Sequence, residues 1–77
     1  MREDEIIPFG KACKVIREEK GKTQGDIFRI TGLERSYVSR FERGKISYPR
    51  LETIIKIAAA LDVSIEEFIR KALDLKK

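Results

Sequence analysis

Histidine is absent from this 77-residue sequence, and cysteine occurs only once, as Cys13. A single cysteine excludes an intrachain disulfide, and the shortage of both residue types excludes the usual zinc-finger ligand sets. No histidine is available to activate Cys13, which falls on an apolar helical stripe, so we expect a small core residue there. With no phosphate-cradling glycine loop either, the sequence predicts that the protein is not an enzyme and needs no metal or cofactor.

Long apolar runs are also missing, and glycine and proline are few, with five and two residues. The sequence shows neither a membrane-spanning stretch nor a charged-then-apolar signal peptide, so we expect a cytoplasmic protein. It shows no linker or repeat, which predicts one domain over residues 1–77. A composition of 42% hydrophobic and 39% charged residues is typical of a folded chain. Since such a short chain buries only a small core, dimerisation would add to its stability.

Periodic apolar residues and capping signals predict an all-α protein of five helices. Thr23 and Asp26 form a capping box that starts a short helix, and Gly32 supplies the backbone freedom needed to end it. Ser64 and Glu67 form a second capping box before the last helix. We therefore expect helices over residues 9–20, 24–31, 35–43, 51–61 and 65–77.

Apolar stripes indicate which faces of these helices are buried. The stripe of the first helix consists of Phe9, Ala12, Cys13 and Ile16. The fourth helix has little polar surface and is expected to be the central core helix, with Leu51, Ile54, Ile55, Ile57, Ala58 and Leu61. The last helix carries a stripe that could fold back on its own core or pair with a second copy: Ile65, Phe68, Ile69, Ala72 and Leu73.

The third expected helix has one apolar and one basic face. Val38 and Phe41 lie on one side, at about 100° per residue. The opposite side spans an arc of about 140° and carries two hydroxyls and three arginines: Arg35, Ser36, Ser39, Arg40 and Arg43. Residues 35–50 hold five basic residues and one acid, so their net charge of +4 equals that of the whole chain. A neutral scaffold with one positive patch is expected for a protein that binds a polyanion.

Two short helices joined by a glycine turn describe a helix-turn-helix. At these residues the sequence resembles a known family. The run TQGDIFRITGLERSYVSRFERGK, preceded by IREEKG and followed by PRLETIIKIAAALDVSIEEF, is similar to the lambda-repressor and Cro type of domain, the xenobiotic-response-element (XRE) family. The resemblance covers residues 9–68, and residues 69–77 would end the last helix. In length and in its RSYVS run, the chain is also similar to the controller proteins of restriction-modification systems.

The resemblance implies a five-helix DNA-binding domain whose third helix enters the major groove of double-stranded DNA. Arginine can bond guanine O6 and N7 as a fork, whereas serine reads either base type. The positions that match base contacts are Arg35, Ser36 and Arg40, with Ser39 nearby. The positions that match phosphate contacts, which give affinity and register, are Gln24, Arg43, Lys45 and Arg50.

Three further positions have implied roles. Tyr37 lies between the two faces of the third helix, so phosphate contact and partial burial are equally favoured. Arg17 and Glu42 match a salt bridge of the family that ties the first helix to the end of the third. The alternative for this pair is two ordinary exposed charges.

The sequence departs from the family pattern at four positions. Phe28 stands where a small alanine normally lets the second and third helices pack closely, and Gly25 weakens the second helix. Glu34 and Arg50 replace residues that commonly cap the third and fourth helices. These changes bear on the tilt of the third helix, and they leave its basic face intact.

Two functions remain open on this pattern. The first is a transcriptional regulator that binds a pseudo-palindromic operator as a homodimer, with no small-molecule ligand and no membrane contact. The alternative is an antitoxin-like module that binds a partner protein. Both readings use the same apolar stripe of the last helix, and the expected dimer interface consists of Ile65, Phe68, Ile69 and Leu73.

Overall fold

The computed structural model describes residues 6–76, which form five helices without a strand. The helices are α1 (Phe9–Glu19), α2 (Gln24–Thr31), α3 (Arg35–Glu42), α4 (Leu51–Ala60) and α5 (Ile65–Lys76). The predicted all-α fold of five helices is therefore confirmed. α1, α3 and α4 end one residue before the predicted limit, and Lys77, expected to end the last helix, lies outside the described residues.

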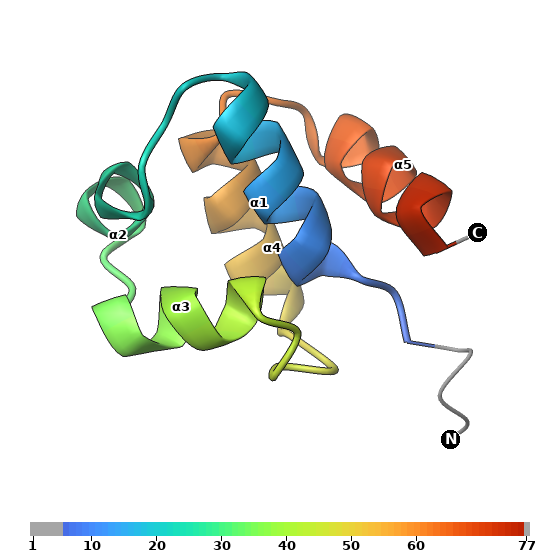
Figure 1. Cartoon of the computed structure of the whole chain (residues 1–77), viewed down its shortest axis with the longest axis horizontal. Helices are drawn as coiled ribbons and strands as arrows, with labels where there is room; N and C mark the ends of the chain where they lie inside the picture. Colours follow the sequence, from blue (N-terminus) through green and yellow to red (C-terminus); the bar gives the residue numbers. More distant parts are fainter. Residues whose placement is uncertain (1–5, 77) are drawn as a thin grey trace.

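Figure 1 shows α1 and α4 side by side in the centre of the molecule, with α5 on one side and α2 and α3 on the other. None of the helices in residues 6–76 combines the length and the apolar character needed to cross a membrane.

The two predicted capping boxes are present. At the start of α2, the amide of Asp26 donates to Thr23 Oγ1 at 3.1 Å, and the amide of Thr23 donates to Asp26 Oδ2 at 2.7 Å. Ser64 and Glu67 exchange the same two bonds before α5, both at 3.0 Å. Gly32 ends α2 with a left-handed φ of 77°. Local residue chemistry therefore fixes where these elements begin and end.

The buried core joins all five helices. Its members are Ala12, Cys13, Ile16, Ile27, Val38, Phe41, Ile54, Ile57, Ala58, Ala60, Leu61, Phe68 and Ala72. The expectation for α4 needs a correction, because Leu51 and Ile55 are 67% and 50% exposed. These two residues lie four apart on a helix face that no other described element covers.

Gly10 brings α1 and α3 into direct backbone contact. A Cβ atom built on Gly10 would lie 1.7 Å from the carbonyl oxygen of Phe41, so no residue with a side chain fits this crossing. Gly10 lies three residues before the buried Cys13 and therefore on the same helical face. A glycine on a buried helix stripe is the signal in the sequence for such a close approach, and Gly10 was not among the predicted core positions.

α5 packs against α1 through the same apolar stripe that was expected to bind a second copy. Phe68 is fully buried, and its ring meets that of Phe9 edge-on, with ring centroids 5.5 Å apart. Phe68 is therefore covered by the core of its own chain, as in the alternative that the stripe folds back on this core. Ile65 and Ile69 are half-buried and Leu73 is 44% exposed, so these three remain at the surface of α5.

Candidate nucleic-acid interface

α2 and α3 form the helix-turn-helix, joined by the three residues 32–34. Figure 1 shows α3 along the lower edge of the molecule, with no other helix beneath it. One long side of α3 is therefore open to a ligand.

The two faces of α3 differ as the sequence predicts. Val38 and Phe41 are buried, at 0% and 1% exposure. The exposed residues of the helix and its C-cap include Arg35, Ser36, Arg40 and Arg43. Ser39 is half-buried, so it lies at the edge of the open face rather than at its centre.

Both arginines of α3 that were predicted to contact bases lie over aromatic rings. The guanidinium carbon of Arg35 is 4.9 Å from the ring centroid of Phe28, and that of Arg40 is 5.8 Å from the ring centroid of Tyr37. Tyr37 is half-buried and stacks on Phe41, with centroids 6.2 Å apart and planes 18° apart. None of these contacts was predicted. The contact of Arg35 with Phe28 depends on how α2 and α3 pack, whereas Tyr37 lies three residues before Arg40 and four before Phe41 on α3, spacings that bring side chains together on one helix.

The end of α3 is fastened to α1 and α2 through one carboxylate, that of Glu42. Arg17 donates to it twice, from Nε to Oε2 at 2.8 Å and from Nη2 to Oε1 at 3.0 Å. Gln24 Nε2 donates to Oε1 at 3.0 Å, and Cys13 Sγ donates to Oε2 at 3.4 Å. Glu42 is only 7% exposed, so its ion pair with Arg17 is largely removed from water. It is the pair that the family resemblance implied, and it explains the single acid within the basic window.

Two ionisable groups of this cluster have shifted pKa values. Burial alone would raise the pKa of Glu42, but the hydrogen bonds from Arg17, Gln24 and Cys13 and the charge of Arg17 outweigh burial and lower it. Burial, the negative charge of Glu42 and the hydrogen bond to it raise the pKa of Cys13. Since the thiolate is the reactive form of cysteine, Cys13 is a packed core thiol rather than a nucleophile.

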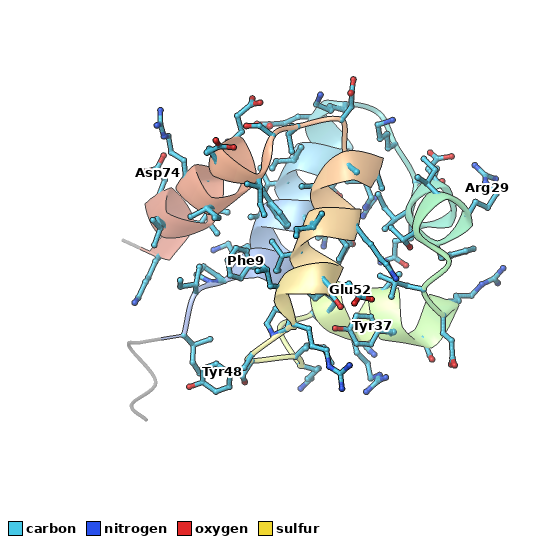
Figure 2. The ribbon with its side chains drawn as sticks, turned by 180° about the vertical axis from the view of Figure 1, so that it is seen from behind. Phe9, Arg29, Tyr37, Tyr48, Glu52 and Asp74 are labelled. Atoms are coloured by element: carbon cyan, nitrogen blue, oxygen red, sulfur yellow. The ribbon has the colours of Figure 1, made fainter. Side chains whose placement is uncertain are left out.

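The remaining predicted contact residues surround α3. Arg43, Lys45 and Arg50 are exposed in or beside the loop between α3 and α4, and Gln24 is half-buried at the start of α2. In Figure 2, the labelled Tyr37 and Tyr48 side chains lie toward the lower edge, which α3 and this loop form. All of the residues predicted to contact bases and phosphates except Gln24 lie in α3 or in and beside the loop that follows it, and Gln24 bonds Glu42 at the end of α3. Within residues 6–76, no group of three metal-ligating side chains occurs.

Comparison with protein families and curated proteins gives a consistent result. The helix-turn-helix family model matches residues 14–68. The transcriptional repressor RghR of Bacillus subtilis is 34% identical over 64 residues, which cover 83% of this chain and 47% of RghR. The regulator SinR of B. subtilis is 32% identical over 61 residues, which cover 79% of this chain and 55% of SinR. The chain spans about half the length of these relatives.

Two solved structures share the fold and about a third of the aligned residues. The restriction-modification controller protein C.AhdI from Aeromonas hydrophila has a TM-score of 0.73 and 36% identity, over 83% of this chain and 96% of C.AhdI. SinR in complex with DNA has a TM-score of 0.71 and 31% identity, over 79% of this chain and 97% of that one. The chain belongs to the helix-turn-helix family, in its lambda-repressor and Cro (XRE) branch.

Proposed function

We propose that this protein is a transcriptional regulator that binds double-stranded DNA in a sequence-specific manner. The observation that carries the proposal is that α3 has two different faces. Its buried face fixes the helix in the fold, and its other face exposes arginines along the open edge of the molecule. Relatives named as transcriptional regulators and the DNA complex of SinR support it.

In this proposal the open face of α3 lies in the major groove and reads base edges. The base-contacting residues are Arg35, Ser36, Ser39 and Arg40. The phosphate-contacting residues, which position the helix, are Gln24, Tyr37, Arg43, Lys45 and Arg50. Gln24 would contribute in two ways, because its amide also braces Glu42 at the end of α3.

We further propose that the regulator acts as a homodimer on a pseudo-palindromic operator. Ile65, Ile69 and Leu73 are the members of the expected interface that the core leaves at least partly exposed. Ile69 and Leu73 line an open hollow on α5 together with Glu66, Arg70 and Asp74. Two recognition helices paired in this way would bind half-sites about 34 Å apart.

The experiment that tests this function is a selection of bound duplexes from random DNA at near-physiological salt, since salt sets the nonspecific background. We expect an enriched motif with two-fold symmetry and half-sites about one helical turn apart. Binding without enrichment that vanishes as salt rises would reduce the site to a nonspecific basic patch.

A matched pair of variants separates the two classes of contact. Arg40→Ala should weaken binding to the selected duplex by about 5- to 150-fold and relax the preference at one base position. Lys45→Ala removes a charge from the same region, so it should weaken binding to all sequences alike and lower the salt slope by about 1. Affinities for selected and random duplexes, measured over a range of salt, check both. An equal loss on both duplexes for Arg40→Ala would contradict the base-reading role.

The exposed apolar residues of α5 also support a second candidate, a module that binds a partner protein. Light scattering on the isolated protein distinguishes the two readings. A dimer whose formation depends on Leu73 favours the regulator, whereas a protein that stays monomeric at high micromolar concentration favours a hetero-partner on α5.

A further inference from the structure

Each arginine proposed to read a base rests on an aromatic side chain. Arg35 and Arg40 are both exposed, yet their guanidinium carbons lie 4.9 Å and 5.8 Å from the ring centroids of Phe28 and Tyr37. Among residues 6–76, neither arginine has a carboxylate within salt-bridge distance. Among residues 6–76, the contacts of the Arg35 and Arg40 guanidinium groups are therefore with the rings of Phe28 and Tyr37 rather than with carboxylates.

The rings are themselves held by the body of the protein. Phe28 and Tyr37 are half-buried and pack against the core. The ring of Phe28 extends over Gly25, where an added Cβ would lie 3.7 Å from the ring tip. Tyr37 stacks on Phe41, which is buried. A guanidinium placed on such a ring has fewer accessible orientations than one surrounded by water.

The family resemblance implies a small residue at the position of Phe28. A small residue there would offer no ring to Arg35, whereas the phenylalanine of this chain places a ring beneath the first arginine of α3.

We propose that Phe28 and Tyr37 are positioning residues for base recognition, which hold Arg35 and Arg40 in place before DNA arrives. This inference rests on the proposed DNA-binding function. An arginine already ordered loses less conformational freedom when it binds a base edge. An arginine held in one orientation is also less able to turn toward a wrong base. Ordering therefore increases the difference in affinity between operator and random DNA.

The main test compares Phe28→Leu with Phe28→Tyr, on the duplex recovered by selection and on a random duplex of equal length. Phe28→Leu removes the ring, so it should weaken binding to the selected duplex by about two- to fivefold and leave random DNA unchanged. Phe28→Tyr keeps the ring and should bind as the wild type does. In an Arg35→Ala background, Phe28→Leu should have no further effect. Additive losses from Phe28→Leu and Arg35→Ala would overturn the proposal.

Tyr37 offers a second comparison, because its ring and its hydroxyl have separate proposed roles. Tyr37→Phe keeps the platform and removes the hydroxyl, whereas Tyr37→Leu removes both. Loss of discrimination with Tyr37→Leu but not with Tyr37→Phe supports a platform for Arg40. A uniform loss on all DNA, equal in the two variants, would leave Tyr37 as a phosphate contact only and would contradict the platform.

A measurement on the free wild-type protein keeps the inference testable if Phe28→Leu does not fold. Nitrogen-15 relaxation should give a higher order parameter for Nε of Arg35 than for Nε of Arg50, an exposed arginine at the start of α4 and away from the proposed dimer surface on α5. Equal values would overturn the proposal without any reference to DNA. If the wild type discriminates between duplexes while these tests fail, only the positioning role is lost. If the wild type shows no discrimination, the proposed function itself fails.

Discussion

Gly10 contributes to the fold by having no side chain. Its backbone lies so close to the carbonyl oxygen of Phe41 that an added Cβ would approach to 1.7 Å, and this oxygen belongs to the backbone of α3. A flexible side chain could move away at little cost, but two helix backbones cannot separate without disturbing the core around them.

Gly10→Ala should therefore destabilise the protein by about 3 kcal/mol or more, although alanine favours helices by about 1 kcal/mol over glycine. The free energy of unfolding in urea checks this. Gly25→Ala is the matched control, because its Cβ would meet Thr23 Oγ1 at an ordinary 3.4 Å, so we expect no loss and a gain of up to about 1 kcal/mol. A Gly10→Ala variant as stable as Gly25→Ala would show that α1 and α3 can move apart freely.

Helix caps were predictable from local patterns, whereas contacts between helices were not, except where the family resemblance implied one. Thr23 and Asp26 satisfy each other three positions apart, so sequence alone revealed their capping box. The contact between Phe28 and Arg35 requires the relative placement of two helices, which no local pattern specifies. Arg17 and Glu42 were predicted from the family resemblance, since nothing in their spacing of 25 residues indicates a pair.

At the scale of helices, two ion pairs tie α1 to its neighbours in different environments. The pair of Arg17 with Glu42 joins α1 to α3, with side chains only 12% and 2% exposed and an Nε–Oε2 distance of 2.8 Å. The pair of Lys71 with Glu19 joins α5 to α1 at 3.6 Å, with side chains 35% and 59% exposed. Solvent screens the second pair much more strongly than the first.

Arg17→Met should lower the free energy of unfolding by about 3 kcal/mol, because it leaves the Glu42 carboxylate buried without its cation. Lys71→Met breaks the exposed pair and should cost about 0 to 1 kcal/mol. Urea unfolding of the two variants under the same conditions gives the comparison. Similar small losses in both would mean that Gln24 and Cys13 suffice to stabilise Glu42.

In the most apolar helices, the hydrophobic pattern does not predict which residues are buried. α4 is so rich in apolar residues that its periodicity does not reveal which side meets solvent, and Leu51 and Ile55 are in fact exposed. In α5 a single stripe contains both the buried Phe68 and the half-exposed Leu73. The way α5 packs on α1 decides which part of the stripe is covered, and this is a property of the assembled fold.

At the scale of the molecule, three carboxylates among residues 6–76 couple folding to pH. The backbone amide and hydroxyl of Thr23 lower the pKa of Asp26, and those of Ser64 lower the pKa of Glu67. The pKa of Glu42 is lowered despite burial, through Arg17, Gln24 and Cys13. Near pH 4 the unfolded chain therefore binds more protons than the folded one, so stability rises with pH in this region.

The free energy of unfolding should be nearly constant above about pH 5 and should fall as acid protonates these carboxylates. The contribution of Glu42 is complete above 4.5, the ordinary pKa of glutamate, and is lost as the pH drops through its lower folded value. The difference in unfolding free energy between wild type and Glu42→Gln should thus shrink in acid. Urea unfolding between about pH 3 and pH 7 measures it, and a constant difference over that range would contradict the low pKa of Glu42.

The backbone contact at Gly10 belongs to the inner side of α3, whose residues differ from those on its exposed side. α3 is held in place by Phe41 and Glu42 on its inner side, while the exposed Ser36 and Arg40 take no part in the core. Under the proposed function, selection for stability acts on the first set of residues, and selection for a target sequence acts on the second. After a gene duplication, two such chains could diverge in the DNA that they recognise while keeping the same scaffold.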